Sequence, residues 1–419
     1  MTATSAAAAA RTRRGPFAGL PREAAILSAV SFTVALGYGI VAPAIPAFAR
    51  QFGVTVAAAA SVISAFALMR VVFALPAGRL VDRFGSRRVM TTGIAVVAVS
   101  SVLAGFSGSF AQLLVLRGVG GLGSAMFSVS AQALLLASVP GDQRGRASGL
   151  YTGGFLLGGI TGPALGGIVA AWSLRAPFFL YGALLVVPAV IAAVALGPAG
   201  RPVARRAATG RAAAGRRESL AVLAGALRSR AYRTVAAVNL ADGFAVLGVR
   251  GAIIPLFVRD SLHRSATWTG IGFLVFAALN GAALLPAGRV ADTLGRRPVM
   301  VAGCATSAAG LLLLAVLPGP WAYLGALAVA GAGSGLLDVA PAAMLGDLLS
   351  AQARQGGVLV AFFQMAGDAG AVTGPVVAGL LVDSASYPAA FALAGGVLAV
   401  AALLAVMTPE CPRDPDTSP

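Results

Sequence analysis

The chain has 419 residues, of which 58% are hydrophobic and only 11% are charged, and its formal net charge is +17. A soluble protein of this composition would lack the polar side chains that hydrate a surface, so the composition excludes a soluble globular protein and indicates folding in lipid. One histidine and two cysteines leave too few ligands and bases for a metal site, a cofactor or a membrane enzyme, and we expect none of these.

Twelve apolar runs follow one another along the chain, each close to the about 20 residues that a helix needs to cross a bilayer. The runs are continuous rather than alternating, which favours helices over a β-barrel. We predict an N-terminal six-helix bundle at 24–197 and a C-terminal six-helix bundle at 234–408. The basic segment 198–233 links them, and the tails are 1–23 and 409–419. The expected spans are 24–48, 56–77, 89–107, 111–138, 147–171, 177–197, 234–258, 267–287, 298–318, 321–349, 357–382 and 387–408.

The basic residues, all of them arginine, are distributed unevenly between alternate loops. With the N-terminus inside, 24 of the 31 arginines fall on the cytoplasmic side, four fall outside and three lie within spans. This bias is the positive-inside rule, which places both termini in the cytoplasm, here at the cell membrane. The basic linker is expected to lie on anionic lipid headgroups or to remain a solvated tether. Because the charge already has this topological role and no aromatic platform accompanies it, binding to nucleic acid is the weaker interpretation.

The stretch that follows the second span is repeated 210 residues later. Residues 76–90, PAGRLVDRFGSRRVM, return as residues 286–300, PAGRVADTLGRRPVM. The repeat indicates two related halves that enter the membrane in the same direction. Glycines let helix ends turn, and an aspartate among arginines forms a charge network that is made in one conformation and broken in the other, whereas topology alone requires no acid. The residues of this expected conformational latch are Gly78, Asp82, Arg83, Gly85, Arg87, Arg88, Gly288, Asp292, Gly295, Arg296 and Arg297.

The fifth span carries glycines at a regular spacing, with a proline among them. Three of the glycines recur every four residues, so they lie on one helix face and permit close helix packing, while the proline favours a kink. The sequence TGPALGG at 161–167 is echoed by TGPVVAG at 373–379 in the eleventh span, which supports the duplication. The positions that make up the pattern G-x8-G-x3-G-P-x2-G-G are Gly149, Gly158, Gly162, Pro163, Gly166 and Gly167.

These motifs resemble those of the major facilitator superfamily, in particular its twelve-span drug/proton antiporters, over nearly the whole chain. The first loop matches G-x-x-x-D-R-x-G-R-R except at Ser86, the fifth span matches at every fixed position, and LGYGIVAPAIP at 36–46 is similar to a first-span element. The fourth span departs from the family pattern because Gly120 replaces a glutamine after Arg117. The resemblance implies an all-α integral membrane protein in which two pseudo-symmetric six-helix bundles enclose a central cavity, and it favours export over uptake.

Charged residues inside the spans point to a functional site, because a charge at the bilayer centre costs at least about 2.5 kcal/mol. In the fold that the resemblance implies, spans one, four, seven and ten line the cavity, and the charged residues around it are Arg117, Asp242, Arg250 and Asp338. We expect Asp242 or Asp338 to carry a proton inward while substrate leaves, with Arg117 tuning affinity. Static pairing that only neutralises the cavity is the alternative.

A second expected pair lies at the boundary between the halves. Arg70 in the second span and Asp368 in the eleventh lie at similar depths, so we predict an interdomain salt bridge between them.

The sequence therefore favours secondary active export of a small amphipathic molecule, such as a drug, antibiotic or secondary metabolite, by proton antiport with alternating access. The transporter is expected to work as a monomer. A lysine-free chain cannot provide the phosphate-binding loop G-x4-G-K-[ST] that ATP-driven transport uses. The alternative is a proton symporter or facilitator that imports a sugar, peptide or organic acid on the same fold.

Overall fold

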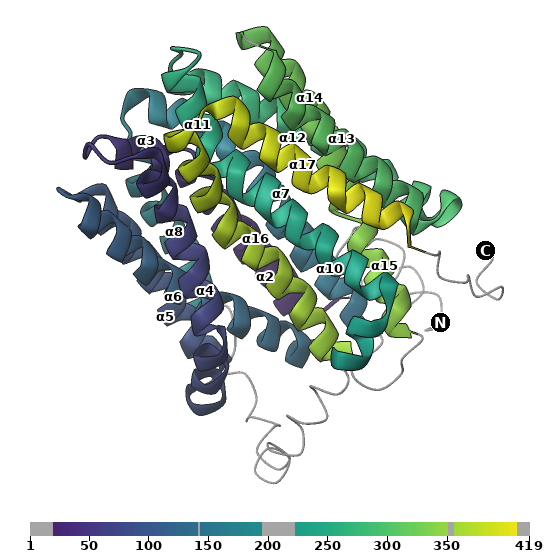
Figure 1. Ribbon diagram of the computed structural model, residues 1–419. Helices are drawn as coiled ribbons and strands as arrows, with labels where there is room; N and C mark the ends of the chain where they lie inside the picture. Colours follow the sequence, from purple (N-terminus) through teal and green to yellow (C-terminus); the bar gives the residue numbers. More distant parts are fainter. Residues whose placement is uncertain (1–19, 141–142, 195–222, 318, 351–355, 409–419) are drawn as a thin grey trace, which may run out of the picture.

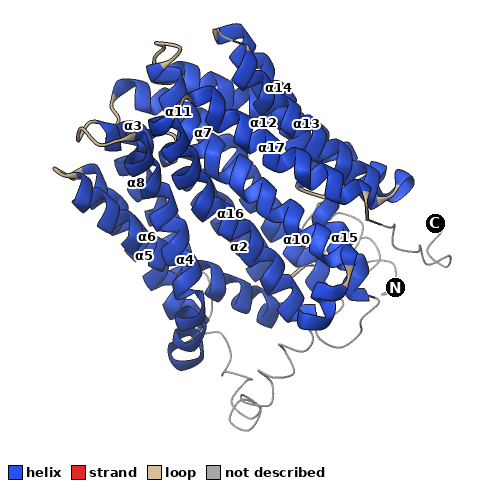
Figure 2. Cartoon of the chain, in the orientation of Figure 1, coloured by secondary structure: helices blue, strands red, loops and turns tan. Residues whose placement is uncertain are grey.

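The computed structural model describes residues 20–140, 143–194, 223–317, 319–350 and 356–408. The predicted tails and most of the predicted linker lie outside these ranges. Within them all regular secondary structure is helical (Figure 2). Twelve helical segments of the described chain are long and apolar enough to cross a membrane, which confirms the prediction of an all-α, twelve-span protein.

The helices of the described residues fall into an N-terminal half and a C-terminal half (Figure 1). The first half consists of α2 (Arg22–Val41), α3 (Ala44–Arg50), α4 (Val56–Phe84), α5 (Ser86–Gly105), α6 (Phe110–Ser138), α7 (Arg144–Trp172) and α8 (Ala176–Val194). The second half consists of α10 (Arg230–Asp242), the π-helix η2 (Gly243–Arg250), α11 (Gly251–Asp260), α12 (Ala266–Leu294), α13 (Arg296–Val316), α14 (Pro320–Leu337), α15 (Ala340–Ser350), α16 (Gly356–Ser384) and α17 (Tyr387–Val406).

Helices α4 and α12 are longer than predicted. Their spans were expected to end at residues 77 and 287, with a loop beginning at Gly78, but helix continues to Phe84 and Leu294. The prolines inside both helices are tolerated, as they are in many membrane helices. Both helices stop only where the next residue is a glycine with positive φ, +85° at Gly85 and +104° at Gly295. Within the repeated motif, the turn is therefore confined to one glycine per copy.

Three spans are irregular near mid-membrane. The first span is interrupted between α2 and α3 before Pro43, and the tenth is interrupted between α14 and α15 at Asp338, just before Pro341. Proline has no backbone N–H to donate to the carbonyl four residues earlier, that of Gly39 or Leu337, so the helical hydrogen bonding is interrupted near both breaks. The seventh span remains helical but changes to π geometry over Gly243–Arg250. Irregular backbone at membrane depth is expected where it lines a cavity.

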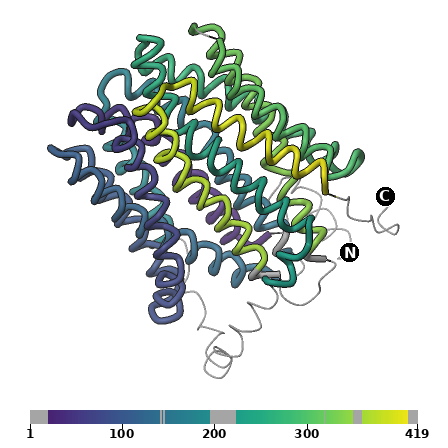
Figure 3. The backbone as a smooth tube through the Cα atoms, viewed as in Figure 1, coloured from purple at the N-terminus to yellow at the C-terminus, as the bar shows by residue number. Residues whose placement is uncertain are grey.

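The bundle has two ends, which we call the Arg50 face and the Gly85 face after residues in their turns. Near the Arg50 face the halves meet closely: a Cβ on Gly167 of α7 would lie 2.2 Å from the Cα of Gly270 on α12. Helices α4 and α16 also meet there and diverge toward the Gly85 face (Figure 3). The two halves are thus joined at the Arg50 face.

Candidate functional site

A cavity of about 270 Å³ lies between the two halves, a volume close to the lower end of typical small-molecule pockets. The N-terminal half contributes mainly apolar and aromatic side chains to it, among them Phe66, Phe127 and Phe155. The C-terminal half contributes both acids of the cavity, Asp242 and Asp338, together with apolar and aromatic side chains of its own. Both carboxylates of the cavity therefore come from one half, while its apolar lining comes from both.

Asp242, Asp338 and Arg250 form an electrostatic cluster in the C-terminal half. Arg250 interacts electrostatically with both acids, and Asp242 is also affected by the charge of Asp338. The Nδ2 of Asn280 donates to Oδ2 of Asp338 at 2.9 Å. By contrast, Oδ1 of Asp242 is buried and has no hydrogen-bond partner in the described part of the chain. A buried carboxylate oxygen without a donor is costly, so Asp242 is the group in this cluster that most needs a proton or a bound cation.

The Arg250 guanidinium is held by aromatic rings rather than by the acids. Its Cζ lies 4.2 Å from the ring centroid of Phe276 and 5.2 Å from that of Phe273, and its Nε donates to the carbonyl of Val246 at 3.2 Å. No ion pair of Arg250 with either cavity acid occurs within the 4.0 Å criterion among the described residues. This leaves the two carboxylates available to other partners.

The π-helix η2 separates Asp242 from Arg250, and sequence reasoning missed it. Two of its glycines lie against α16: a Cβ on Gly243 would be 2.0 Å from the carbonyl oxygen of Gly367, and one on Gly248 would be 2.9 Å from Pro375. Wider turns of this kind occur mostly at functional sites. The closely spaced glycines were the one available signal, and they do not distinguish a π-helix from ordinary close packing.

Arg117 lies behind the cavity wall rather than in it. It is 1% exposed, and its Cζ lies 4.6 Å from the Phe66 ring centroid and 5.9 Å from that of Tyr38, two residues that do line the cavity. Its Nε and Nη2 have no hydrogen-bond partner within the described ranges. The structure thus brings together three of the four charged residues expected in the cavity and places the fourth behind two aromatic rings.

Arg70 and Asp368 contact each other across the boundary between the halves, where Nη2 of Arg70 donates to Oδ1 of Asp368. Arg70 also lines the cavity. One and a half turns closer to the Arg50 face, the hydroxyl of Ser64 donates to the carbonyl of Val372 at 2.6 Å, which gives α4 and α16 a second polar contact. The cavity therefore adjoins the interface between the halves at the Arg70–Asp368 pair.

One contact occurs in equivalent form in both copies of the repeated motif. Arg87 donates to the carbonyl of Ala193 at the end of α8, and Arg297 donates to the carbonyls of Ala405 and Val406 at the end of α17. Each arginine satisfies carbonyls that a helix end leaves free. The third and sixth spans of each half are joined in this way.

The remaining latch residues differ between the copies. In the second copy Arg296 binds Asp292 and, through Nε, Asp347 at 3.2 Å. In the first copy Asp82 is exposed and has no ion pair within the described residues, while Arg83 lies over the Phe84 ring at 5.2 Å. Arg88 is exposed, and the glycines Gly78 and Gly288 have open space beside them. The side-chain contacts that we describe for these residues stay within one half.

The glycines of the fifth span divide into two groups. A Cβ on Gly158, Gly162 or Gly166 would lie 2.2–2.5 Å from a backbone oxygen of α2, and Gly167 packs against α12. The Cδ of Pro163 is also within 2.8 Å of the position that a Cβ on Gly39 would take. Gly149 has open space around it and makes no comparable approach. The pattern is therefore a packing surface for α2 and α12 over most of its length.

Comparison with known proteins identifies the family. The family model described as Major Facilitator Superfamily matches residues 27–249 and 235–419. The chain belongs to the major facilitator superfamily. Membership in this superfamily, together with the twelve apolar helices of the described residues, establishes a multi-pass membrane protein.

Two curated superfamily relatives match parts of the chain. It is 34% identical over 205 residues to "Uncharacterized MFS-type transporter Rv1877" of Mycobacterium tuberculosis (strain ATCC 25618 / H37Rv), covering 48% of this chain and 30% of the relative. It is 28% identical over 163 residues to "Quinolone resistance protein NorA" of Staphylococcus aureus (strain MRSA252), covering 39% of this chain and 42% of the relative. The matched region thus spans less than half the length of either relative.

Solved structures share the fold at low identity. A bacterial homologue of the human lysosomal transporter Spinster, in an inward-facing and unoccupied conformation, has a TM-score of 0.72 at 15% identity, covering 92% of this chain and 94% of that one. A peptide transporter, POT, has a TM-score of 0.73 at 17% identity, covering 96% and 97%. The nucleoside transporter NupG has a TM-score of 0.68 at 12% identity, covering 92% and 99%. These likenesses concern the fold alone.

Proposed function

We propose that this superfamily member exports a small amphipathic molecule in exchange for protons. The observation that carries the proposal is the cavity between the halves, in which mainly apolar and aromatic side chains accompany two carboxylates, those of Asp242 and Asp338. The apolar wall suits the body of an amphipathic substrate. The carboxylates suit either a proton or a cationic group of the substrate, but not both at once.

Competition between proton and substrate for the carboxylates couples proton entry to substrate export. Oδ1 of Asp242 is buried without a hydrogen-bond donor among the described residues, so either a proton must neutralise the carboxylate or the substrate must pair with its charge. When substrate leaves on the outer side, a proton takes its place; when the cavity returns to the inner side, incoming substrate displaces the proton. Proton and substrate are exchanged one for the other because the cavity with neither a bound substrate nor a protonated carboxylate is the least stable state.

The direction of transport is proposed from the charge bias and the relatives. The arginine-rich side would be cytoplasmic in the cell membrane, with both termini there and with anionic lipid headgroups beside it. The Gly85 face would then be the inner face, and the closed Arg50 face the outer one. The quinolone-resistance relative supports a drug or antibiotic as cargo, and we propose a monomer as the working unit.

The second candidate is proton symport or facilitated import of a sugar, peptide or organic acid. Structural neighbours described as a nucleoside transporter and a peptide transporter have the same fold, so the fold is compatible with such solutes. The glycine pattern of α7 favours export, because its fixed positions are those of the antiporters that the sequence resembles. The accumulation of a panel of dyes and antibiotics in expressing cells distinguishes the two. Export lowers accumulation and an uncoupler restores it, whereas import raises accumulation.

The proton-coupling residues are tested by replacing each acid with its amide. In proteoliposomes with an imposed pH gradient, Asp242→Asn and Asp338→Asn should each abolish proton-driven transport, because an amide can neither exchange the proton nor pair with a cationic group of the substrate. Asp260→Asn is the matched control, because Asp260 lies on the Arg50 face, where it accepts a hydrogen bond from Tyr387 at 2.7 Å. Undiminished coupling in both single variants and in the double variant would refute the proposal.

A further inference from the structure

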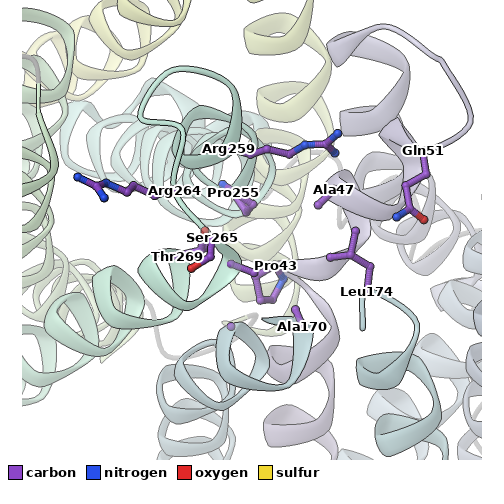
Figure 4. Close-up of a pocket in the computed structure, with 12 residues that line it drawn as sticks. Pro43, Ala47, Gln51, Ala170, Leu174, Pro255, Arg259, Arg264, Ser265 and Thr269 are labelled. Carbon is purple, nitrogen blue, oxygen red and sulfur yellow. The ribbon is translucent and has the colours of Figure 1, made fainter. Parts of the chain in front are cut away.

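A second cavity, of about 250 Å³, lies between the halves at the Arg50 face (Figure 4). The N-terminal half contributes residues of α3 and α7 to it, and the C-terminal half contributes residues of α11 and the start of α12. Figure 4 shows Ser265 and Thr269 of α12 next to Pro43, with Arg259 and Arg264 extending from the rim in opposite directions. This pocket is distinct from the central cavity, with which it shares only Pro43.

Helices α16 and α4 are the pseudo-symmetric counterparts of α7 and α12, and their contact shows which group can bind at the start of such a helix. At the end of α16, Asp383 accepts hydrogen bonds from the backbone amides of Val56 and Ala57, at 2.9 Å and 2.8 Å. These amides open α4, and Thr55 caps the next amide, that of Ala58, at 3.3 Å. A carboxylate from one half thus completes the N-terminus of a 29-residue helix in the other half.

The corresponding start of α12 lacks this carboxylate. The repeat offset of 210 residues makes Ser265 the counterpart of Thr55, and the offset of 212 between the glycine–proline segments makes Ala171 the counterpart of Asp383. The Ser265 side chain makes no capping hydrogen bond, and the amides of Ala266 and Thr267 have no acceptor among the described residues. The pocket lies beside this helix end, because Ser265 and Ala266 line it.

A threonine of the same pocket has a hydroxyl without a hydrogen-bond partner among the described residues. Thr269 lies one turn into α12, is 3% exposed and lines the pocket, yet its hydroxyl makes no hydrogen bond with the described residues. The side chain is therefore placed to donate to a bound group that the protein itself does not supply. It is an observation independent of the helix end, and it points to a ligand with an oxygen acceptor.

The charges around the pocket are predominantly positive. Arg259 and Arg264 belong to its lining. The nearest acid in sequence, Asp260, is already engaged, by the Tyr387 hydroxyl at 2.7 Å and by Arg259 at 3.8 Å. Apart from Gln51, the remaining walls, such as Leu174 and Pro255, are apolar. A pocket with a free helix N-terminus, a positive rim and apolar walls selects an anion that has a small apolar body.

We propose that this pocket binds a small amphipathic carboxylate, which completes the N-terminus of α12 as Asp383 completes that of α4. The bound carboxylate contacts both halves, so it holds the Arg50 face closed and slows alternating access. The site is regulatory and separate from the route of the transported substrate.

Benzoate is the probe, and benzamide is its uncharged counterpart of the same shape. Titration of the purified protein in nanodiscs, followed by ligand-observed NMR, should show benzoate binding at least about tenfold tighter than benzamide. Thr269→Val, which keeps the shape and removes the hydroxyl, and Arg259→Gln should each weaken benzoate binding by about three- to tenfold. Arg175→Gln is the matched control, since Arg175 lies over the Phe48 ring at 5.6 Å and does not line the pocket.

The decisive variant is Ala171→Asp, which supplies the missing carboxylate from the protein itself. It should abolish benzoate binding, whereas Ala171→Asn should retain it. Equal binding of benzoate and benzamide, or full benzoate binding by Thr269→Val and Arg259→Gln, would overturn the proposal. These two variants decide the matter even if Ala171→Asp does not fold. Because binding is measured without a proton gradient, its outcome is independent of whether the protein exports or imports.

Discussion

Among single residues, Arg70 and Asp368 form the charged contact between α4 and α16. Their side chains are 32% and 27% exposed, so water weakens the attraction relative to a fully buried pair. We expect Arg70→Ala to destabilise the protein by about 1–2 kcal/mol, because it leaves the Asp368 carboxylate half-buried without its cation. The double variant with Asp368→Ala should lose less than Arg70→Ala alone.

Thermal unfolding of the four proteins in a double-mutant cycle measures this coupling. A loss in the double variant equal to the sum of the losses in the two single variants would show that the contact carries no coupling energy. The counterpart of Arg70 in the second half is Asn280, which donates to Asp338 instead. The equivalent position therefore contacts the other half in the first copy, through Arg70, and a cavity acid in the second copy, through Asn280.

At the level of helices, the glycines of α7 set how closely it approaches α2. A Cβ on Gly166 would lie 2.2 Å from the carbonyl oxygen of Ile40, which is backbone and cannot move aside without shifting α2. We expect Gly166→Ala to cost about 1–3 kcal/mol, the usual range for overpacking. Gly153→Ala in the same helix is the control, because Gly153 has open space around it and alanine favours helix by about 0.5–1 kcal/mol.

Unfolding temperatures of the two purified variants should therefore move in opposite directions. A similar fall in unfolding temperature for Gly166→Ala and Gly153→Ala would mean that α7 tolerates no added side chain at either position. The close approach of α7 to α2 would then not be the cause of the destabilisation. The transport rate of Gly166→Ala should fall along with its stability, since α7 contacts both α2 and α12.

Much of the element structure could be predicted from the sequence, because an apolar run of about 20 residues has few alternatives in a bilayer. The predicted start of α4 at residue 56 agrees with the structure, while its end at 77 does not. The helix end depends on the positive φ of Gly85, and a composition break at Gly78 does not reveal it. The π-helix was unpredictable for a related reason: it depends on how Gly243 packs against another helix.

The charged site could be predicted in part. The fold that the family resemblance implies placed Asp242, Asp338 and Arg250 near one another, and the structure shows them around one cavity. They could not place Arg117, because its position depends on the rings of Phe66 and Tyr38 from two other helices. Contacts between distant spans are set by packing, which a single sequence does not encode in any local pattern.

For the whole molecule, the two halves are closed against each other at the Arg50 face, and Asp383 is the residue that does so by charge-assisted hydrogen bonds. Alternating access requires this face to open, and the bonds to Val56 and Ala57 must then break. Replacing Asp383 by alanine removes them and leaves two helix amides to water. We expect the balance to shift toward conformations open at the Arg50 face by about tenfold, which corresponds to about 1.4 kcal/mol.

Spin labels at Gly108 and Trp321, exposed positions in opposite halves on the Arg50 face, report the opening as a longer distance. The labelling background needs only Cys411→Ser, since the other cysteine, Cys304, is buried. Ser384→Ala is the matched control, because the Ser384 hydroxyl donates to Leu380 within its own helix. If Asp383→Ala keeps the distance distribution of the control, the closed face must rest on glycine packing such as that of Gly167 with Gly270 rather than on the Asp383 carboxylate.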